Sequence, residues 1–249
     1  MASAPKLDGI LNNRVMLEQP ANGYRVAIDT VLLAAAVPAL AGDRVLDMGC
    51  GVGGVLLCLA ARVEGVRGTG LEIQPDLADM GRRNIGRNAF AAGLDVKQGD
   101  VTQLPPDFSS AFDHVLMNPP YHDEARHDVS ANKSKQTANS DRAGDLALWI
   151  GAAATALKPS GSLTIIHRAD RQHEILSYLQ ADFGDVQLLP LLPRAGEAAK
   201  RVIIRARKGM FFSLRPCRPL VLHKEGGAYT EAAEAILRHA QALSAVASE

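Results

Sequence analysis

Short apolar runs alternate with longer amphipathic stretches through most of the chain. The short runs, bounded by glycine, proline or polar residues, predict seven strands: Arg44–Met48, Arg67–Glu72, Asp95–Gln98, Phe112–Met117, Ser162–His167, Val186–Leu192 and Arg201–Arg207. Apolar residues three and four apart predict helices over Ile28–Ala41, Gly54–Val63, Pro75–Ala91, Leu146–Leu157, Gln172–Ala181 and Thr230–Leu243. Because crossover connections between parallel strands are right-handed, this order is typical of an α/β fold: a mostly parallel sheet with helices on both faces.

Two parts of the chain depart from this alternation. Residues before Ile28 predict an irregular start, so we expect residues 1–43 to form an N-terminal lead-in with a helix, and residues 44–249 to form one main domain. Residues 122–144 are polar without periodicity, and a loop of that length is typical of a functional lid or of disorder. The last two strands are expected to form an antiparallel hairpin at one edge of the seven-stranded sheet.

Composition sets limits on the kind of protein. The 249 residues are 47% hydrophobic and 22% charged with a net charge of zero, so any surface for a polyanion must be a local basic patch. Three cysteines without a CxxC pair suit a reducing compartment. The start has no signal-peptide pattern, and no apolar run approaches the about 20 residues of a membrane span, so we expect a cytoplasmic protein with no membrane role.

A glycine-rich turn follows the first predicted strand. Between Asp47 and Gly54 the chain leaves a strand and enters a helix, and the glycines let the backbone approach a ligand where a Cβ would clash. Glu72 ends the next predicted strand, where an acid in such folds binds a ribose diol. The two features together predict a nucleoside site.

The same turn is open to other interpretations. Gly49, Gly51 and Gly54 also satisfy the GxGxxG pattern of dinucleotide binding, which is weak alone, and glycines occur in plain strand-to-helix turns. Asp47 favours another ligand, because a carboxylate inside the turn would repel a pyrophosphate and attract a cationic amino-acid group. Asp100, after the third strand, is suited to an adenine amino group but is equally typical of a turn former.

The sequence Asn118-Pro119-Pro120-Tyr121 follows the fourth predicted strand. Methyl transfer to an amino group on an aromatic ring is slow because the nitrogen lone pair is delocalised, and acceptors for both amine hydrogens make that nitrogen more nucleophilic. The Asn118 side-chain carbonyl and the Pro119 backbone carbonyl supply two such acceptors, and the fixed φ of each proline holds them in place. Tyr121 is suited to stack on a base, and a plain proline turn is the alternative.

These motifs, in this order, resemble the class I S-adenosylmethionine-dependent amino methyltransferases, which have a Rossmann-like fold. The resemblance covers roughly residues 20–210 and is specific at 118–121. Within that superfamily the chain looks most like the bacterial tRNA N6-adenine methyltransferases that modify the adenine beside the anticodon of a valine tRNA. The segments that carry this closer resemblance are Gly23–Ala34, Ala125–His127, Lys200–Arg205 and Gly226–Glu231.

The resemblance implies S-adenosylmethionine as cofactor and the N6 amino group of an adenine in RNA, with tRNA first, as acceptor. The implied catalytic residues are Asn118, Pro119, Pro120 and Tyr121. The implied cofactor-binding residues are Tyr24, Arg25, Asp47, Gly49, Cys50, Gly51, Gly53, Glu72, Ile73, Gly99, Asp100, Val101 and Asn118.

Other acceptors and roles stay open. A protein glutamine, rRNA or a small-molecule amine would suit the same acceptor geometry, although the release-factor methyltransferases that share this motif carry a helical N-terminal domain, for which the residues before Val45 are too few. A non-catalytic RNA-binding protein that kept the fold is a further hypothesis. The histidines and acids of residues 122–128 match no metal-ligand spacing, so no metal is expected.

RNA binding would require a local basic face beside the site. The candidate residues are Arg126, Lys133, Lys135, Arg142, Arg194, Lys200, Arg201, Arg205, Arg207, Lys208, Arg215 and Arg218. The alternative is that these charges only keep a loop and an edge hairpin soluble.

Overall fold

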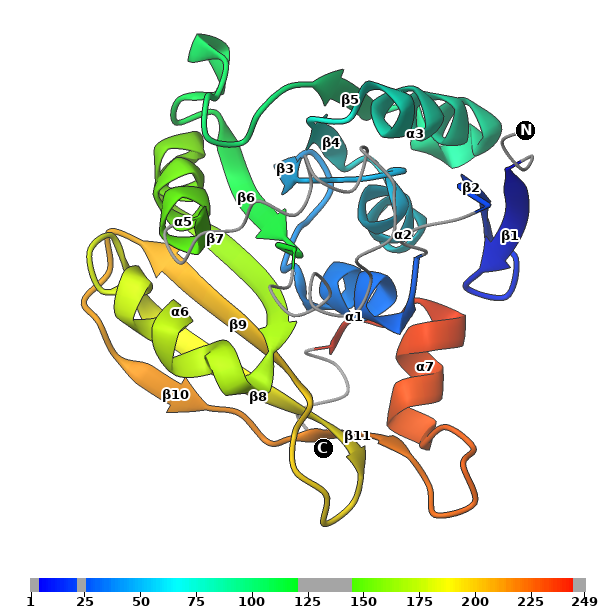
Figure 1. Ribbon diagram of the computed structural model, residues 1–249, viewed down its shortest axis with the longest axis vertical. Coiled ribbons are helices and arrows are strands. Elements are labelled where there is room, and N and C mark those ends of the chain that lie inside the picture. Colours follow the sequence, from blue (N-terminus) through cyan, green and yellow to red (C-terminus); the bar gives the residue numbers. More distant parts are fainter. Residues whose placement is uncertain (1–4, 22–25, 121–144, 244–249) are drawn as a thin grey trace, which may run out of the picture.

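The computed structural model describes residues 5–21, 26–120 and 145–243 of the chain (Figure 1). The strands are β1 (Lys6–Ile10), β2 (Val15–Gln19), β3 (Arg44–Met48), β4 (Arg67–Glu72), β5 (Leu94–Gln98), β6 (Phe112–Met117), β7 (Leu157–Arg168), β8 (Phe183–Arg194), β9 (Arg201–Lys208), β10 (Leu214–Pro216) and β11 (Leu220–His223). The helices are α1 (Ile28–Ala36), α2 (Gly54–Arg62), α3 (Pro75–Arg87), α5 (Asp145–Ala156), α6 (Gln172–Leu179) and α7 (Glu231–His239), with 3-10 turns η1 (Ala89–Ala91), η2 (Pro106–Phe108) and η4 (Ala169–Arg171).

The main sheet has the order β10-β8-β9-β7-β6-β3-β4-β5, with β11 also paired to β8. All neighbours are parallel except β9, which runs antiparallel to both β7 and β8. The seven predicted strands are all present as β3 to β9, so the α/β prediction is confirmed.

The predicted strand count and edge were wrong. The described sheet has nine strands, because β10 and β11 extend it beyond β8. The β8–β9 pair is therefore an antiparallel hairpin, as predicted, but it lies inside the sheet. The added strands have three and four residues, too few to show an alternating pattern, and β10 contains a proline.

The start of the chain, predicted to be irregular, forms the antiparallel hairpin β1–β2. Its turn uses left-handed backbone at Leu11, Asn12 and Asn13, a conformation that asparagine tolerates better than most residues. The hairpin is tied to α3 by the buried Asn84, whose amide accepts from the Glu18 backbone N–H at 2.7 Å and donates to the Glu18 carbonyl at 3.0 Å. Because these are backbone contacts, side-chain periodicity did not reveal them.

Three predicted helices end four or five residues early, and one of them, α7, ends at His239, where Ala240 takes left-handed backbone. Helix α1 ends at Ala36, because Pro38 disfavours helical backbone in the residue before it and cannot donate a helical hydrogen bond. Helix α3 ends at Arg87, where Asn88 leaves helical geometry and its side chain donates to the Met16 carbonyl at 2.9 Å. Packing against the N-terminal hairpin therefore sets the end of α3.

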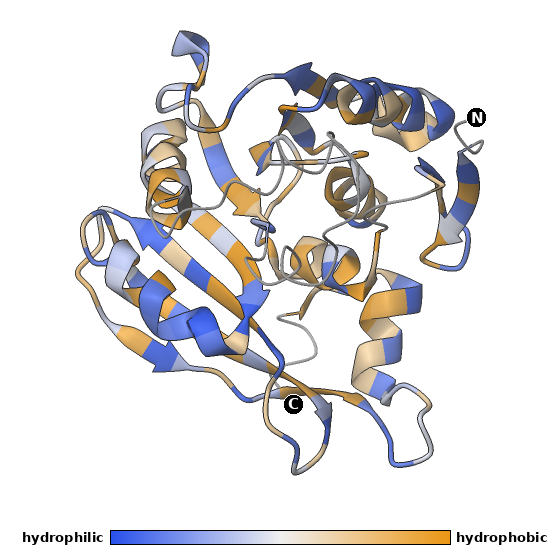
Figure 2. Cartoon of the chain, in the orientation of Figure 1, coloured by the Kyte–Doolittle hydropathy of each residue, from blue (hydrophilic) through white to orange (hydrophobic). Residues whose placement is uncertain are grey.

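Each face of the sheet carries its own apolar cluster. One cluster combines α1, α2 and α7 with residues such as Leu116 and Ile203, and the other combines α5 and α6 with residues such as Met117 and Ile204. Figure 2 shows hydrophobic residues gathered in the central strands and in α1 and α2. None of the helices within the described ranges has the length and apolar content of a bilayer-crossing segment.

Two histidines of the central strands are shielded from solvent. Burial, with the Arg171 guanidinium nearby, lowers the pKa of His167 to about 4, and its side chain is 3% exposed. Burial also lowers the pKa of His114, against the opposing effect of Asp43, whose carboxylate lies 3.1 Å from Nε2. Protonation of either ring therefore favours the unfolded chain.

We expect His167 to make folding stability depend on pH. Its folded-state pKa lies below the value of about 6.5 in an unfolded chain, so its stabilising contribution is complete above that value and is lost as the pH falls toward about 4. From about pH 7.5 to about pH 5 this residue should cost about 2 kcal/mol. Urea unfolding across this range should show a flatter pH dependence for His167→Gln than for wild type, with His114 retained in both. Equal slopes would contradict this assignment.

Candidate active site

The carboxyl ends of four neighbouring parallel strands bring the predicted site residues together. Met48, the last residue of β3, pairs with Leu71 of β4 on one side and with Met117 of β6 on the other. The next residues along these strands, Gly49, Glu72 and Asn118, therefore emerge side by side, at a strand spacing of about 4.8 Å. On the far side of β4, the Gly99 N–H donates to the Glu72 carbonyl at 2.9 Å.

The glycine turn after β3 is held against β4 and requires left-handed backbone. The N–H groups of Gly49 and Cys50 donate to the Leu71 carbonyl at 2.8 and 3.1 Å. Gly49, Gly51 and Gly53 have φ values of +69°, +54° and +81°, a region that residues with a Cβ rarely adopt. Gly53 is also the N-cap of α2. The turn thus exposes a backbone surface that other residues could not form.

Glu72 is fixed by the turn it faces. Its side chain is 5% exposed, and its two carboxylate oxygens accept hydrogen bonds from the Gly51 N–H and the Gln74 N–H, each at 2.9 Å. A carboxylate has about four acceptor positions. Glu72 therefore keeps acceptor capacity for the hydroxyl groups of a ribose.

Asp47 is a buried acid with one carboxylate oxygen that lacks a hydrogen-bond partner among the described residues. The residue is 2% exposed, and this oxygen is Oδ2. Burial, reinforced by the negative charge of Glu72, raises the pKa of Asp47 well above its usual value. A ligand with a positive amino group would supply the missing partner and favour the ionised acid. The site therefore fits a nucleoside that carries a cationic amino-acid end.

The remaining predicted cofactor residues differ in what they can contribute. Cys50 is buried, and burial raises the pKa of its thiol, so it remains a neutral apolar group under Gly70. Ile73 is 47% exposed and Val101 is buried. The Asp100 carboxylate accepts from the Thr102 N–H and hydroxyl, both at 2.8 Å, so its turn-forming role is present, while contact with an adenine stays a prediction.

Asn118 follows β6 directly and is half-buried, with Pro119 buried and Pro120 exposed. Its position beside Gly49 places an amide at the point where the glycine turn and the β6 loop meet. Tyr121, Tyr24 and Arg25 lie outside the described residues, as do residues 122–144 with their histidines and acids. Within the described residues, no group of three or more histidine, cysteine or acidic side chains could hold a metal ion.

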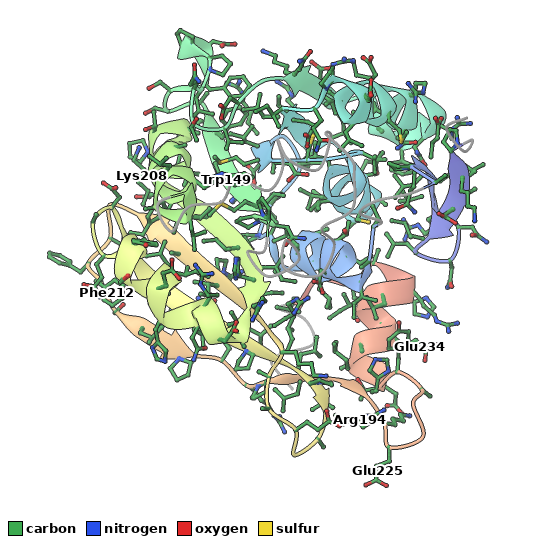
Figure 3. The ribbon with its side chains drawn as sticks, viewed as in Figure 1. Trp149, Arg194, Lys208, Phe212, Glu225 and Glu234 are labelled. Carbon is green, nitrogen blue, oxygen red and sulfur yellow. The ribbon has the colours of Figure 1, made fainter. Side chains whose placement is uncertain are left out.

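Trp149 of α5 was not among the predicted site residues. A Cβ on Gly49 would lie 2.6 Å from the ring carbon Cη2 of Trp149, so the indole covers one side of the glycine turn. Figure 3 shows Trp149 on the side of α5 that faces the sheet. Its spacing from the buried Leu146, Ile150 and Ala153 indicates this inward face and could have identified it.

Several cations predicted to face RNA are bound by protein groups instead. Arg201 pairs with Asp29, Nε to Oδ2, at 3.0 Å, and Arg205 donates to the side-chain carbonyl of Gln187. Further ion pairs are Arg194 with Glu197 and Arg215 with Asp185. Arg126, Lys133, Lys135 and Arg142 lie outside the described residues. One continuous basic face therefore stays a prediction.

Comparison with curated proteins finds relatives of one activity. The tRNA1(Val) (adenine(37)-N6)-methyltransferase of Mannheimia succiniciproducens is 27% identical over 226 residues, which are 86% of this chain and 86% of that protein. The protein of the same name from Yersinia pestis is 36% identical over 98 residues, 39% of this chain and 40% of that protein.

Solved structures give the same fold. A protein from Agrobacterium tumefaciens, described as a predicted O-methyltransferase, matches with a TM-score of 0.70 and 28% identity over 86% of this chain and 97% of its own. A SAM-dependent O-methyltransferase from Thermotoga maritima matches with a TM-score of 0.55 and 17% identity, covering 77% of this chain and 69% of its own, which shows the fold alone. The prediction of a Rossmann-like class I methyltransferase fold is confirmed.

The model of one protein family, described as the methyltransferase small domain, matches residues 23–190. This range contains the glycine turn, Asp47, Glu72 and Asn118, whose arrangement fits S-adenosylmethionine. The chain therefore belongs to the methyltransferase small domain family and is an enzyme that uses S-adenosylmethionine as its methyl donor.

Proposed function

We propose that this enzyme transfers a methyl group to the N6 amino group of an adenine in tRNA. The observation that carries the proposal is the position of Asn118, which leaves β6 directly beside the glycine turn that follows β3. Support also comes from the relative from Mannheimia succiniciproducens, whose named activity is adenine N6 methylation and which aligns over 86% of both chains.

Asn118 and Pro119 would bind the amino group that receives the methyl. The Asn118 side-chain carbonyl accepts one amine hydrogen and the Pro119 backbone carbonyl accepts the other, which draws the nitrogen lone pair out of the ring. Bound S-adenosylmethionine supplies a methyl group already activated on a sulfonium. The active site then needs no general base of unusual pKa, because the methylated amine can release its proton to water. Positioning carries most of the rate.

The cofactor would be held by the two buried acids and the indole. Asp47 binds the ammonium of the amino-acid end, Glu72 accepts from the ribose hydroxyls, and Trp149 keeps the glycine turn in place from the α5 side. Further contacts rest on the family resemblance alone. Tyr24 and Arg25 would cover the cofactor, and Ile73 and Val101 would lie near the adenine of the cofactor.

A target adenine within folded RNA has to leave its stack to reach Asn118. Tyr121 is proposed as the surface on which the adenine stacks once it has turned out. A tRNA substrate also implies that the enzyme works in the cytoplasm. Cations near the site would bind the phosphates of that tRNA.

Asn118→Ala should remove methyl transfer and leave cofactor binding intact. Loss of one acceptor aimed at the reacting amine should lower kcat by about 100-fold or more, because such groups act mainly in the transition state. Labelled methyl transfer to deproteinised tRNA from a strain that lacks this protein, followed by nucleoside mass spectrometry, would show N6-methyladenosine with wild type only.

Calorimetry with S-adenosylhomocysteine separates the two roles that the resemblance implies for Asn118: we expect a Kd within about threefold of wild type if its main contact is to the acceptor, and a larger rise in Kd would assign it to the cofactor instead. Unchanged tRNA methylation by Asn118→Ala would refute the assigned role. Methylation of rRNA, of a release-factor glutamine or of a small amine, without methylation of tRNA, would refute the proposed acceptor.

Asp47 and Glu72 should be separable by the part of the cofactor that each binds. Asp47→Asn should raise the Kd for S-adenosylhomocysteine by about tenfold or more, the range for loss of a hydrogen bond to a charged group. The Kd for methylthioadenosine, which lacks the amino-acid end, should be nearly unchanged. Glu72→Gln should raise the Kd for both ligands, because both contain the ribose. Calorimetry of the two variants with the two ligands tests this assignment, and equal losses of both ligands in Asp47→Asn would contradict it.

A further inference from the structure

Exposed apolar side chains gather in one loop far from the candidate active site. Four of the nine large hydrophobic side chains that are exposed in the described part of the chain lie between Met210 and Leu214. Phe211 is 97% exposed, and Met210, Phe212 and Leu214 are 41%, 41% and 45% exposed. Isolated exposed apolar residues are ordinary, but a cluster of this kind is typical of a binding surface. We refer to residues 207–218 as the Phe211 loop.

The backbone of the Phe211 loop is held firmly against the start of β8. The Gly209 N–H donates to the Asp182 carbonyl at 2.8 Å, the Phe211 carbonyl accepts from Asp185 at 3.2 Å, and the Ser213 carbonyl accepts from Val186 at 2.7 Å. Gly184 makes this approach possible, because a Cβ there would lie 2.0 Å from the Phe211 carbonyl oxygen. The Phe211 ring therefore projects into solvent from an ordered backbone.

Positive charges flank these rings, and the loop contains no acidic residue. Arg207, Lys208, Arg215 and Arg218 are its charged residues. Arg207 and Lys208 donate to backbone carbonyls, of Ser160 at 3.3 Å and of Leu157 at 2.8 Å. In the described ranges no carboxylate lies within ion-pair distance of Arg207, Lys208 or Arg218, whereas Arg215 pairs with Asp185. The loop thus presents aromatic rings within a net positive surface.

The loop lies apart from the catalytic edge of the sheet. Ile165 of β7 pairs both with Met117, which precedes Asn118, and with Ile204 of β9. Lys208 is four residues beyond Ile204, which is about 14 Å along β9, and β9 is two strand spacings, about 10 Å, from β6. Figure 3 shows Lys208 and Phe212 at the same outer margin of the molecule. A small acceptor at Asn118 would not reach this loop.

We infer that the Phe211 loop is a second RNA-binding site, which contacts a part of the folded tRNA remote from the methylated adenine. Exposed aromatic rings stack on unpaired bases, and arginine and lysine bind the adjoining phosphates. The loop itself contains no acid, and its three cations without a carboxylate partner in the described ranges outnumber the exposed Asp182 beside Gly209, which favours a polyanion over a protein with an apolar face. This inference rests on the proposed tRNA substrate and names a further surface that the substrate uses.

The double variant Phe211→Ala/Phe212→Ala tests the inference. We expect its Kd and KM for tRNA to rise about tenfold, within the range measured for lost base stacking, with kcat at saturating tRNA and the Kd for S-adenosylhomocysteine unchanged. Phe90→Ala is the matched control, because Phe90 is 43% exposed in η1, next to α3, and should leave all four values unchanged. Both changes are at the surface, and thermal unfolding confirms that the variants are folded.

The outcomes separate this inference from the proposed function. If wild type methylates tRNA and the double variant keeps its KM and its Kd for tRNA, the inference fails and the function stands. If tRNA binding depends on the loop but no tRNA is methylated, the inference stands and the function fails. A wild type that does not bind tRNA overturns both. A dimer in sedimentation that the double variant abolishes, with an unchanged Kd for tRNA, would assign the loop to a second copy of the chain and overturn the inference.

Discussion

The parallel pairing of β3 with both β4 and β6 is the constraint on which the site depends. Parallel strands end at one edge, so every residue that follows a strand reaches the same surface, and the equivalent positions of Met48, Leu71 and Met117 set which residues meet there. A slip of one residue in either pair would turn Asp47 or Glu72 to the opposite face of the sheet.

The strand pairing also brings two acidic side chains, Asp47 and Glu72, close together in a buried site, and their charges affect ligand binding. Asp47 and Glu72 are both buried, and the charge of Glu72 adds to the effect of burial in raising the pKa of Asp47. Glu72 is compensated by two backbone N–H groups, whereas Asp47 Oδ2 has none among the described residues. Burial therefore disfavours the ionised form of Asp47, and a cationic amino group beside it would offset that cost. Ligand binding should thus contribute to the stability of the fold as well as to catalysis.

Residues with a strong local signal were predictable from the sequence, and those positioned by distant contacts were not. Strands β3, β4 and β6 match their predicted bounds, because β3 and β6 are short apolar runs that end at a glycine turn or at Asn-Pro-Pro, and β4 lies between two predicted helices and ends at an acid. The positions of Asp47, Glu72 and Asn118 at or next to strand ends were likewise predictable, whereas their binding roles stay proposals. The β1–β2 hairpin escaped prediction because it is held by the Asn84 amide and backbone groups, and Trp149 because its role depends on how α5 lies over Gly49.

The neutral total charge of the chain is compatible with RNA binding once the charges are placed in space. Arg201, Arg205 and Arg215 are bound by groups within the protein, so they contribute less to a cationic surface than their positions along the sequence suggest. Three of the cations that have no carboxylate partner among the described residues, Arg207, Lys208 and Arg218, lie in the Phe211 loop with its exposed rings. The loop therefore carries a net positive charge of its own. Such a region can position a large polyanion through a few contacts, while the proposed role of Asn118 is to bind the reacting amine.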